Sequence, residues 1–345
     1  MRKIKIENKL IGDGQPCFIV AEIGCNHNGK LEQAKEMIDL ALEAGCDAVK
    51  FQSFAANKLF NEYFDYTQQG PRRKNWIGLL RSLELPKEWH LFLSKYCRQK
   101  GIIFFSSVCD EERVDWLEEI NVPAFKVPSY ELTHIPLIKY IARKGKPIIL
   151  SSGIGNEREI EEAINIIYQE GNRDVILMHC VSAYPTKFED LSLKTIPYYK
   201  KRFEIPVGLS DHSLGTLSSS LAVTLGADIV EKHITLEKTL PGPDHYFALD
   251  KKEIKEWVSR IRETEKALGK IKKEPAAGEK NEVFWRRAIW AKQDIPKGTE
   301  LTEDMLMIVR PSPKDCLEPK RIYEILGRET KKDIKKGELI TWDKL

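Results

Sequence analysis

Short apolar runs of β type alternate with longer amphipathic segments along most of the chain, up to about residue 268. Helical periodicity marks segments such as 31–44, 87–100, 157–170 and 253–268, and Gly45, Gly101, Gly145 and Gly171 stand where helices are expected to end. This alternation predicts a parallel α/β domain. The apolar runs occupy residues 17–24, 47–52, 102–107, 124–129, 147–152, 175–180, 206–212 and 229–235.

The eight strand-helix units favour a closed barrel over an open sheet. An open doubly wound sheet seldom has eight such evenly spaced units, and it would need a glycine-rich phosphate fingerprint after its first strand, which this sequence lacks. The predicted fold class is therefore α/β, with a (β/α)8 TIM barrel over residues 1–270.

A second, smaller domain is expected beyond the barrel. Residues 271–285 form a polar stretch typical of a linker, and residues 286–345 contain a short repeat in which Asp294-Ile-Pro-Lys-Gly298 is echoed by Asp333-Ile-Lys-Lys-Gly337. Each copy places Lys-Gly in a turn between short apolar runs, which predicts a small β-rich module. Because a module of about sixty residues is barely stable alone, we expect it to pack on the barrel or on a partner subunit.

One long interruption, at residues 54–85, separates the second strand from its helix and carries Arg72, Arg73, Asn75 and Trp76. A loop of this length inside a compact domain is usually functional. A lid over the barrel mouth is one interpretation, and a plain surface excursion is the other.

Composition excludes several classes of partner. Lysine and arginine number 55 against 52 aspartates and glutamates, and the two signs are interspersed, so we expect no nucleic-acid binding. No apolar run is long enough to span a bilayer or to form a signal core, so no membrane association is expected. The seven cysteines are scattered without a Cys-x-x-Cys pair, which fits a reducing cytoplasm.

Polar residues gather at the carboxyl ends of the predicted strands. A single polar residue there is commonly a cap or a turn, but in a barrel all eight ends meet at one mouth, where the active sites of such folds lie. The side chains at these ends are Glu22, Lys50, Gln52, Ser106, Ser107, Lys126, Ser129, Ser151, Ser152, His179, Ser210, His212, Glu231 and His233.

The last two strands each supply a histidine. Alternation places Ser210 with His212 on one face of the seventh strand, and Glu231 with His233 on one face of the eighth. Two imidazoles could bind one divalent metal and leave positions for water and a substrate oxygen. The alternative is that both rings form ordinary hydrogen bonds at strand ends, and spacing alone leaves both interpretations open.

Lysines and serines at the other strand ends suit a small, highly charged anion that carries phosphate and carboxylate, such as a phosphorylated keto or enol acid. The simpler alternatives are that the serines form hydrogen bonds within turns, and that the lysines bury only their aliphatic chains and extend their ammonium groups to water. Glu22 is a candidate for proton transfer or water placement, or else a partner for Lys50 or Lys126. The candidate anion ligands are Lys50, Ser107, Lys126, Ser129, Ser151, Ser182 and Ser210.

Several motifs, in this order along the chain, resemble those of the sialic acid synthase family. The C-terminal module, with Arg286-Arg-Ala-Ile289 and the Asp-Ile-x-Lys-Gly repeat, is similar to the antifreeze-like (SAF) domain of these enzymes. The barrel motifs are Ala21-Glu-Ile-Gly-Cys-Asn-His-Asn-Gly29, Lys50-Phe-Gln52, Phe125-Lys-Val-Pro-Ser129, Ile149-Leu-Ser-Ser-Gly153, His179-Cys-Val-Ser-Ala-Tyr-Pro-Thr186, Gly208-Leu-Ser-Asp-His-Ser213, Glu231-Lys-His233 and Pro241-Gly-Pro-Asp-His245.

The resemblance implies a synthase that joins phosphoenolpyruvate to an N-acylated, mannosamine-like sugar. A divalent ion, manganese in the first place and magnesium or cobalt otherwise, would bind His212 and His233 and polarise the sugar aldehyde. The C3 carbon of phosphoenolpyruvate would attack that aldehyde, water would add at C2, and phosphate would leave by C–O cleavage. With the two histidines, Glu22 and Lys126 would form the catalytic group.

The resemblance also assigns the substrate contacts. Gln52, Glu131, Tyr184 and Asp244 would contact the sugar, and Glu231 would line the substrate pocket. The small domain would swap across a homodimer, so that Arg310 reaches the partner's sugar pocket. Phosphoenolpyruvate would be held by Lys50, Ser107, Lys126, Ser129, Ser151, Ser182 and Ser210.

The sequence departs from the family pattern at two places that bear on the sugar. Ser182 stands where sialic-type members commonly have asparagine, and Pro311-Ser-Pro-Lys-Asp-Cys316 replaces a stretch that is often glycine-rich. A pseudaminic- or legionaminic-type synthase acting on a 2,4-diacetamido-trideoxyhexose, or a synthase for a spore-coat polysaccharide sugar, is therefore an alternative. Two further alternatives are a Schiff-base aldolase using Lys126 or Lys232 and a glycan-binding protein without activity.

Overall fold

The computed structural model describes residues 2–64, 66, 76–271 and 273–345. The chain divides into two compact units, Met1–Gly269 and Lys270–Leu345. The predicted linker, 271–285, falls in the second unit, where its described residues include two 3-10 turns, η5 (Ala277–Glu279) and η6 (Glu282–Trp285).

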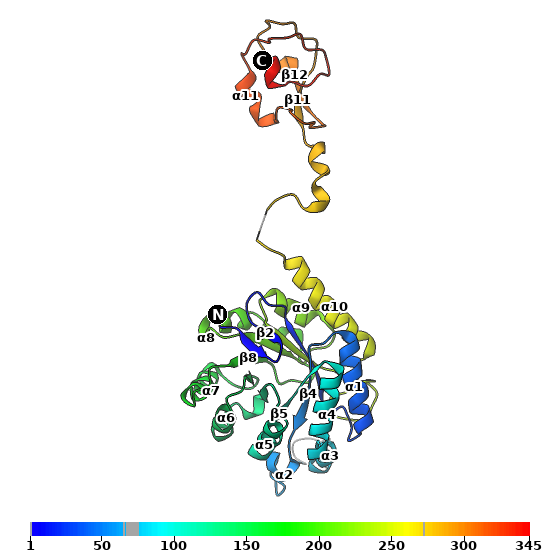
Figure 1. Ribbon diagram of the computed structural model, residues 1–345, viewed down its shortest axis with the longest axis vertical. Helices are drawn as coiled ribbons and strands as arrows, with labels where there is room; N and C mark the ends of the chain where they lie inside the picture. The colour runs from blue at the N-terminus through cyan, green and yellow to red at the C-terminus, as the bar shows by residue number, and fades with distance from the viewer. Residues whose placement is uncertain (1, 65, 67–75, 272) are drawn as a thin grey trace. The chain divides into compact units, whose positions relative to one another are not determined.

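The first unit is a closed barrel of parallel strands, which confirms the predicted fold class (Figure 1). Every neighbouring pair is parallel, and β10 closes the ring by pairing with both β9 and β3. The strands are β3 (Phe18–Gly24), β4 (Ala48–Ser53), β5 (Ile103–Val108), β6 (Phe125–Val127), β7 (Ile148–Ser151), β8 (Val175–Cys180), β9 (Val207–Asp211) and β10 (Ile229–His233).

Helices cover the outside of the barrel (Figure 1). Gly45 and Gly101 adopt left-handed backbone angles directly after α1 and α4, as the sequence predicts, and their amides bond the last helical carbonyls. The helices that follow the strands are α1 (Leu31–Ala44), α4 (Lys87–Lys100), α5 (Glu111–Glu119), α6 (Ile135–Ala142), α7 (Glu157–Gln169), α8 (Thr195–Phe203), α9 (Leu217–Thr224) and α10 (Lys251–Leu268).

The barrel interior is apolar toward the amino ends of its strands. Inward side chains such as Phe105 and Met178 are fully buried there. A small hairpin of β1 (Ile4–Ile6) and β2 (Lys9–Ile11) adds Ile4, Ile6 and Ile11 to the same cluster. Because apolar side chains fill this end of the interior, the inward-facing charged side chains gather at the opposite, carboxyl end.

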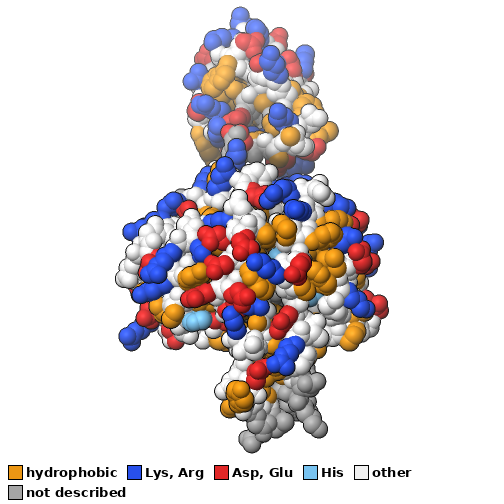
Figure 2. Space-filling model, turned by 60° about the horizontal axis from the view of Figure 1, so that its bottom comes forward, with side chains coloured by type: hydrophobic (Ala, Val, Ile, Leu, Met, Phe, Trp, Pro, Cys, Tyr) orange, Lys and Arg blue, Asp and Glu red, His pale blue; other side chains and the backbone are white. Residues whose placement is uncertain are grey.

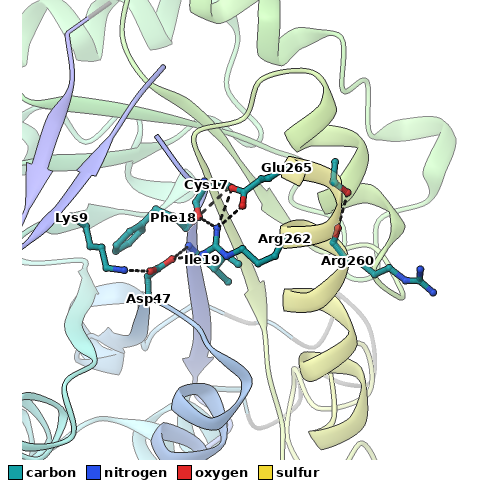
Figure 3. Close-up of polar contacts among 9 residues, drawn as sticks. Lys9, Cys17, Phe18, Ile19, Asp47, Arg260, Arg262 and Glu265 are labelled. Carbon is teal, nitrogen blue, oxygen red and sulfur yellow. Dashed lines mark hydrogen bonds and ion pairs between the residues drawn. The ribbon is translucent and has the colours of Figure 1, made fainter. Parts of the chain in front are cut away.

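A polar network ties α10 to the base of the barrel (Figure 3). Asp47 accepts a bond from the Ile19 amide at 2.9 Å, and its carboxylate pairs with Arg262 at 3.0 Å and with Lys9 at 2.6 Å. Glu265 accepts from the Cys17 amide at 2.5 Å. Strand, hairpin and helix are therefore joined through one carboxylate.

Part of the long loop at 54–85 forms two short helices, α2 (Ala56–Leu59) and α3 (Trp76–Leu83). Leu80 and Leu83 pack with Ala56 and Phe54 in a small buried cluster. Arg72, Arg73 and Asn75 lie outside the described residues. The lid interpretation stays a prediction.

The second unit contains one antiparallel sheet, of β11 (Ala288–Ala291) and β12 (Leu306–Val309), and a short helix, α11 (Ile322–Ile325). The sequence repeat forms two matching turns. The Lys336 amide donates to Asp294 at 2.8 Å and the Lys297 amide donates to Asp333 at 2.7 Å, so each turn is capped by the aspartate of the other. Isolated bridges replace some of the expected β-structure.

Acidic and basic side chains are interspersed over the barrel face in Figure 2, as the sequence indicates. None of the helices in the described ranges is long and apolar enough to cross a bilayer.

Replacing Asp47 tests the network at the base. We expect Asp47→Ala to lower the free energy of unfolding by about 2–3 kcal/mol, because Arg262 and the Ile19 amide lose a largely buried acceptor. Lys58→Ala, which removes an exposed pair with Glu112, is the control, with an expected loss below about 1 kcal/mol. Denaturant unfolding measures both, and equal midpoints would contradict the assignment.

Candidate active site at the barrel mouth

Four charged side chains from different strands meet inside the mouth. Lys50 on β4 lies 2.9 Å from Glu22 on β3 and 3.4 Å from Glu231 on β10. Lys126 on β6 lies 3.0 Å from the other oxygen of Glu231. None of the four residues is more than 4% exposed. Gln52 donates to Glu22 at 2.9 Å, so one predicted sugar contact also belongs to this cluster.

The cluster separates the proton affinities of its two carboxylates. Burial raises the pKa of Glu22 to about 7 even though Lys50 opposes the shift. Burial would also raise the pKa of Glu231, but Lys126 and Lys50 outweigh it and hold that pKa at about 2. Burial lowers the pKa of Lys126 more than Glu231 raises it. The mouth thus has one permanently charged carboxylate and one that titrates near neutrality.

The two histidines lie beside each other, as predicted. The centres of the His212 and His233 rings are 5.5 Å apart. The Nδ1 atom of His212 is 2.9 Å from the Val181 carbonyl, and in the tautomer that donates this bond Nε2 has a free lone pair. The Nδ1 atom of His233 is buried without a hydrogen bond within the described part of the chain, and lies 3.6 Å from Asp244. A divalent ion fits such a pair.

The surroundings keep His233 neutral. Burial, His212 and Lys50 together lower its pKa well below the usual range, which leaves the imidazole able to bind a cation. Burial raises the pKa of Asp244 to about 6. No group of three or more His, Cys, Asp and Glu side chains in the described ranges is arranged to hold a metal. The two imidazoles are the ligands that the candidate centre would offer, and a bound ion would need further oxygens to complete its coordination.

Polar groups that follow β6, β7 and β8 lie close together around Gly153. The Gly153 amide donates to the Ser129 hydroxyl at 3.0 Å. A Cβ atom on Gly153 would stand 2.4 Å from the Ser182 hydroxyl and 2.7 Å from that of Ser129, so a larger residue would require both hydroxyls to move. The Cys180 sulfur borders the same position and lies 3.9 Å from Nδ1 of His212. Hydroxyls and an amide converging in this way suit an anion.

Three other predicted substrate contacts, Ser210, Tyr184 and Glu131, occupy different surroundings. Ser210 donates to Glu231 at 3.3 Å, and the ring of Tyr184 lies 4.3 Å from that of His212, centre to centre, so both belong to the mouth. Glu131 is buried in the turn after β6. Its carboxylate lies 3.1 Å from Nδ1 of His134, within hydrogen-bond distance.

Three further candidates do not join the charged cluster. Ser107 donates to the Phe51 carbonyl at a long 3.5 Å, and Ser151 is buried at the end of β7. Arg310 is exposed directly after β12, in the second unit, so its predicted role in a sugar pocket stays a prediction.

Lys232, considered above as a Schiff-base lysine, lies on the opposite face of β10 from Glu231 and His233. Its ammonium pairs with Asp211 at 2.9 Å and donates to the Ser213 carbonyl at 2.5 Å. The strand's alternation, which puts residues 231 and 233 inside, already places residue 232 outside. The geometry therefore does not support a nucleophilic role for Lys232.

Sequence reasoning did not find Cys180, Gly153 or Asp211 as parts of the site. Gly153 and Cys180 stand within motifs quoted above, but their contacts depend on how the loops after β7 and β8 approach each other. Asp211 carries a visible signal, because a charged residue on the outer face of a strand buried on both sides requires a partner.

Comparison with known proteins identifies the family of the chain. The NeuB family model matches residues 37–273, and the SAF domain model matches residues 286–345. The chain belongs to the NeuB family. The resemblance to sialic acid synthases and to their SAF domain is confirmed.

Three relatives show the range of the family. The spore coat polysaccharide biosynthesis protein SpsE of Bacillus subtilis is 40% identical over 99% of this chain and 97% of its own. The N,N'-diacetyllegionaminic acid synthase of Legionella pneumophila is 37% identical over 96% and 95%. The crystal structure of the N-acetylneuraminic acid synthetase of Leptospira borgpetersenii, in complex with citrate, has a TM-score of 0.75 and 36% identity, covering 82% of this chain and 95% of that one.

Removing Glu231 tests whether the cluster is held by charge. We expect Glu231→Ala to lower the free energy of unfolding by about 3–5 kcal/mol, because Lys126 and Lys50 would both lose a buried counter-ion. The matched control is Ser210→Ala, which removes only a neutral donor to the same carboxylate and should cost about 1 kcal/mol. Denaturant unfolding of both variants gives the comparison, and equal losses would speak against a charge-held cluster.

Proposed function

We propose that this protein is a nonulosonic acid synthase that condenses phosphoenolpyruvate with an N-acylated, mannosamine-like sugar and releases phosphate. The observation that carries the proposal is one barrel mouth that combines two adjacent histidines, two buried lysines and the converging hydroxyls of Ser129 and Ser182. Family membership gives this combination its chemical meaning.

The buried cations suit phosphoenolpyruvate. Lys50 and Lys126 lie within 3.4 Å of carboxylates in the free protein, so their positive charges are already positioned when an anion arrives. Ser129 and Ser182, whose hydroxyls converge at Gly153, offer further donors at the ends of neighbouring strands. Preorganised donors of this kind stabilise developing negative charge without reorganising.

His212 and His233 would hold a divalent ion, manganese in the first place, with magnesium or cobalt as alternatives. When bound, such an ion supplies Lewis-acid polarisation of the sugar aldehyde. Tyr184 and Asp244 border the same pair and are suited to contact the sugar, together with Gln52 and Glu131.

Glu22 is suited to proton transfer near the phosphoenolpyruvate carbon that water attacks. Its pKa of about 7 lets it hold or release a proton under neutral conditions. Its oxygens are held by Lys50 and Gln52, which fixes its orientation. The water that adds at C2 must lose a proton, and Glu22 is the buried carboxylate best matched to accept it.

The cellular setting belongs to the proposal as well. All seven cysteines are free, which fits a reducing cytoplasm. We place the enzyme there as a domain-swapped homodimer in which Arg310 reaches the sugar pocket of the partner. This arrangement would give an otherwise small second unit a large surface to pack on.

The sugar is the part of the proposal with competing candidates. One relative is named for legionaminic acid and another for spore coat polysaccharide. A 2,4-diacetamido-trideoxyhexose, or a spore-coat sugar precursor, is therefore the alternative to an N-acyl mannosamine.

Metal removal tests the histidine pair. We expect excess chelator to abolish phosphate release from phosphoenolpyruvate plus sugar, and manganese to restore it. His212→Ala and His233→Ala should each lose activity and manganese binding. His179→Gln is the control, because His179 is also a buried strand-end histidine but bonds the Leu191 carbonyl at 2.7 Å. Full activity in excess chelator would overturn the metal assignment.

A substrate panel identifies the sugar. N-acetylmannosamine, its 6-phosphate and 2,4-diacetamido-trideoxyhexoses are each incubated with phosphoenolpyruvate and manganese, and products are read by mass. We expect one sugar to give a product larger by the pyruvate unit, with an equal amount of phosphate. Sugar binding without any product across the panel would instead favour a glycan-binding protein.

A further inference from the structure

A buried ion pair lies directly behind the two histidines. Asp211 precedes His212 on β9, and Lys232 precedes His233 on β10. The two residues are cross-strand partners, and their charged groups are 2.9 Å apart. Since alternate residues face opposite sides of a strand, this pair lies outside the barrel wall while both histidines lie inside.

The Asp211 carboxylate is fully occupied. One oxygen accepts from the Ser213 amide at 3.0 Å and from the Ser213 hydroxyl at 2.7 Å. The other accepts from Lys232 and from the hydroxyls of Ser218 at 2.5 Å and Ser219 at 2.8 Å, in the first turn of α9. All five residues are at most 2% exposed. A charge buried this completely keeps its geometry only while every partner stays in place.

These contacts enclose the backbone of His212. Regular pairing of β9 ends at Asp211, so His212 lies one residue beyond the strand. The bond from the Asp211 side chain to the Ser213 amide closes a turn around His212. Lys232 holds the Ser213 carbonyl from the neighbouring strand at 2.5 Å. The cluster therefore holds Ser213, the residue after His212, and Lys232, the residue before His233.

We propose that Asp211, Lys232 and the serines around them are positioning residues that set the spacing of His212 and His233 for a shared divalent ion. This inference rests on the proposed metal role of the two histidines. The competing explanation is a purely structural ion pair that attaches α9 to the barrel.

The chain contains a matched control on the same two strands. Asp228 precedes β10 at its amino end, is 7% exposed, pairs with Lys200 at 2.9 Å and accepts from the Val207 amide at 3.0 Å. It resembles Asp211 in burial and in its lysine partner but lies at the opposite end of the strands. Asp228→Asn should therefore weaken the fold without reaching the histidines.

The experiment compares Asp211→Asn, Asp228→Asn and the unaltered full-length chain. Manganese affinity is measured by calorimetry, ligand geometry by the absorption spectrum of bound cobalt, and stability by thermal unfolding. We expect both variants to melt earlier. Only Asp211→Asn should weaken manganese binding, by about tenfold or more, the range seen when groups behind metal ligands are removed. Its cobalt spectrum should also change.

A milder variant covers the case in which Asp211→Asn does not fold. Ser219→Ala removes one donor to the carboxylate and should weaken manganese binding in the same direction, while Asp228→Asn does not. Unchanged affinity and an unchanged cobalt spectrum in the Asp211 and Ser219 variants would overturn the inference while leaving the metal site intact. If the unaltered chain binds neither manganese nor cobalt, the proposed metal role itself fails, and this inference with it.

Discussion

Four buried charges impose the strongest constraint on this barrel. Moving two lysines and two glutamates out of water costs several kcal/mol for each ion, and only close pairing offsets that cost. The pairing of Glu22 with Lys50 needs β3 beside β4, and that of Glu231 with Lys126 spans the barrel interior from β10 to β6. The ring must therefore close in one register for these charges to be satisfied.

The same constraint separates the two ends of the interior. Apolar side chains from the strands and the amino-terminal hairpin fill the interior at the base. The charged side chains that face inward lie at the carboxyl end, where they satisfy one another. An anion entering the mouth would exchange carboxylate partners for its own charges, so the lysines would not have to be desolvated again for binding.

The sequence predicts this plan well because it depends on local pattern. Eight apolar runs, their spacing and the polar residues at their ends are visible without any tertiary information, and alternation correctly places His212 beside His233. The same alternation along β10 puts Lys232 on the outer face of the barrel wall, opposite to Glu231 and His233. Partners across the barrel are different, because the stagger of the strands decides that Glu231, and not Glu22, meets Lys126. The loops that bring Cys180 and Gly153 together carry no periodic signal either.

The contacts of Asp211 explain why polar residues interrupt the apolar pattern at the end of β9 and at the start of α9. Ser210-Asp-His-Ser213 breaks the expected alternation, since four consecutive polar residues span the end of β9, a strand buried on both faces, and the turn that follows it. Helix α9 breaks its own pattern too, because three consecutive serines, 218–220, follow its first residue. Ser218 and Ser219 meet Asp211, so the outer polar residue of the strand and the polar start of the helix satisfy each other. Two local departures from an apolar core are thus one feature, located behind the histidine pair, and departures of this kind are expected where a fold serves a site and not stability alone.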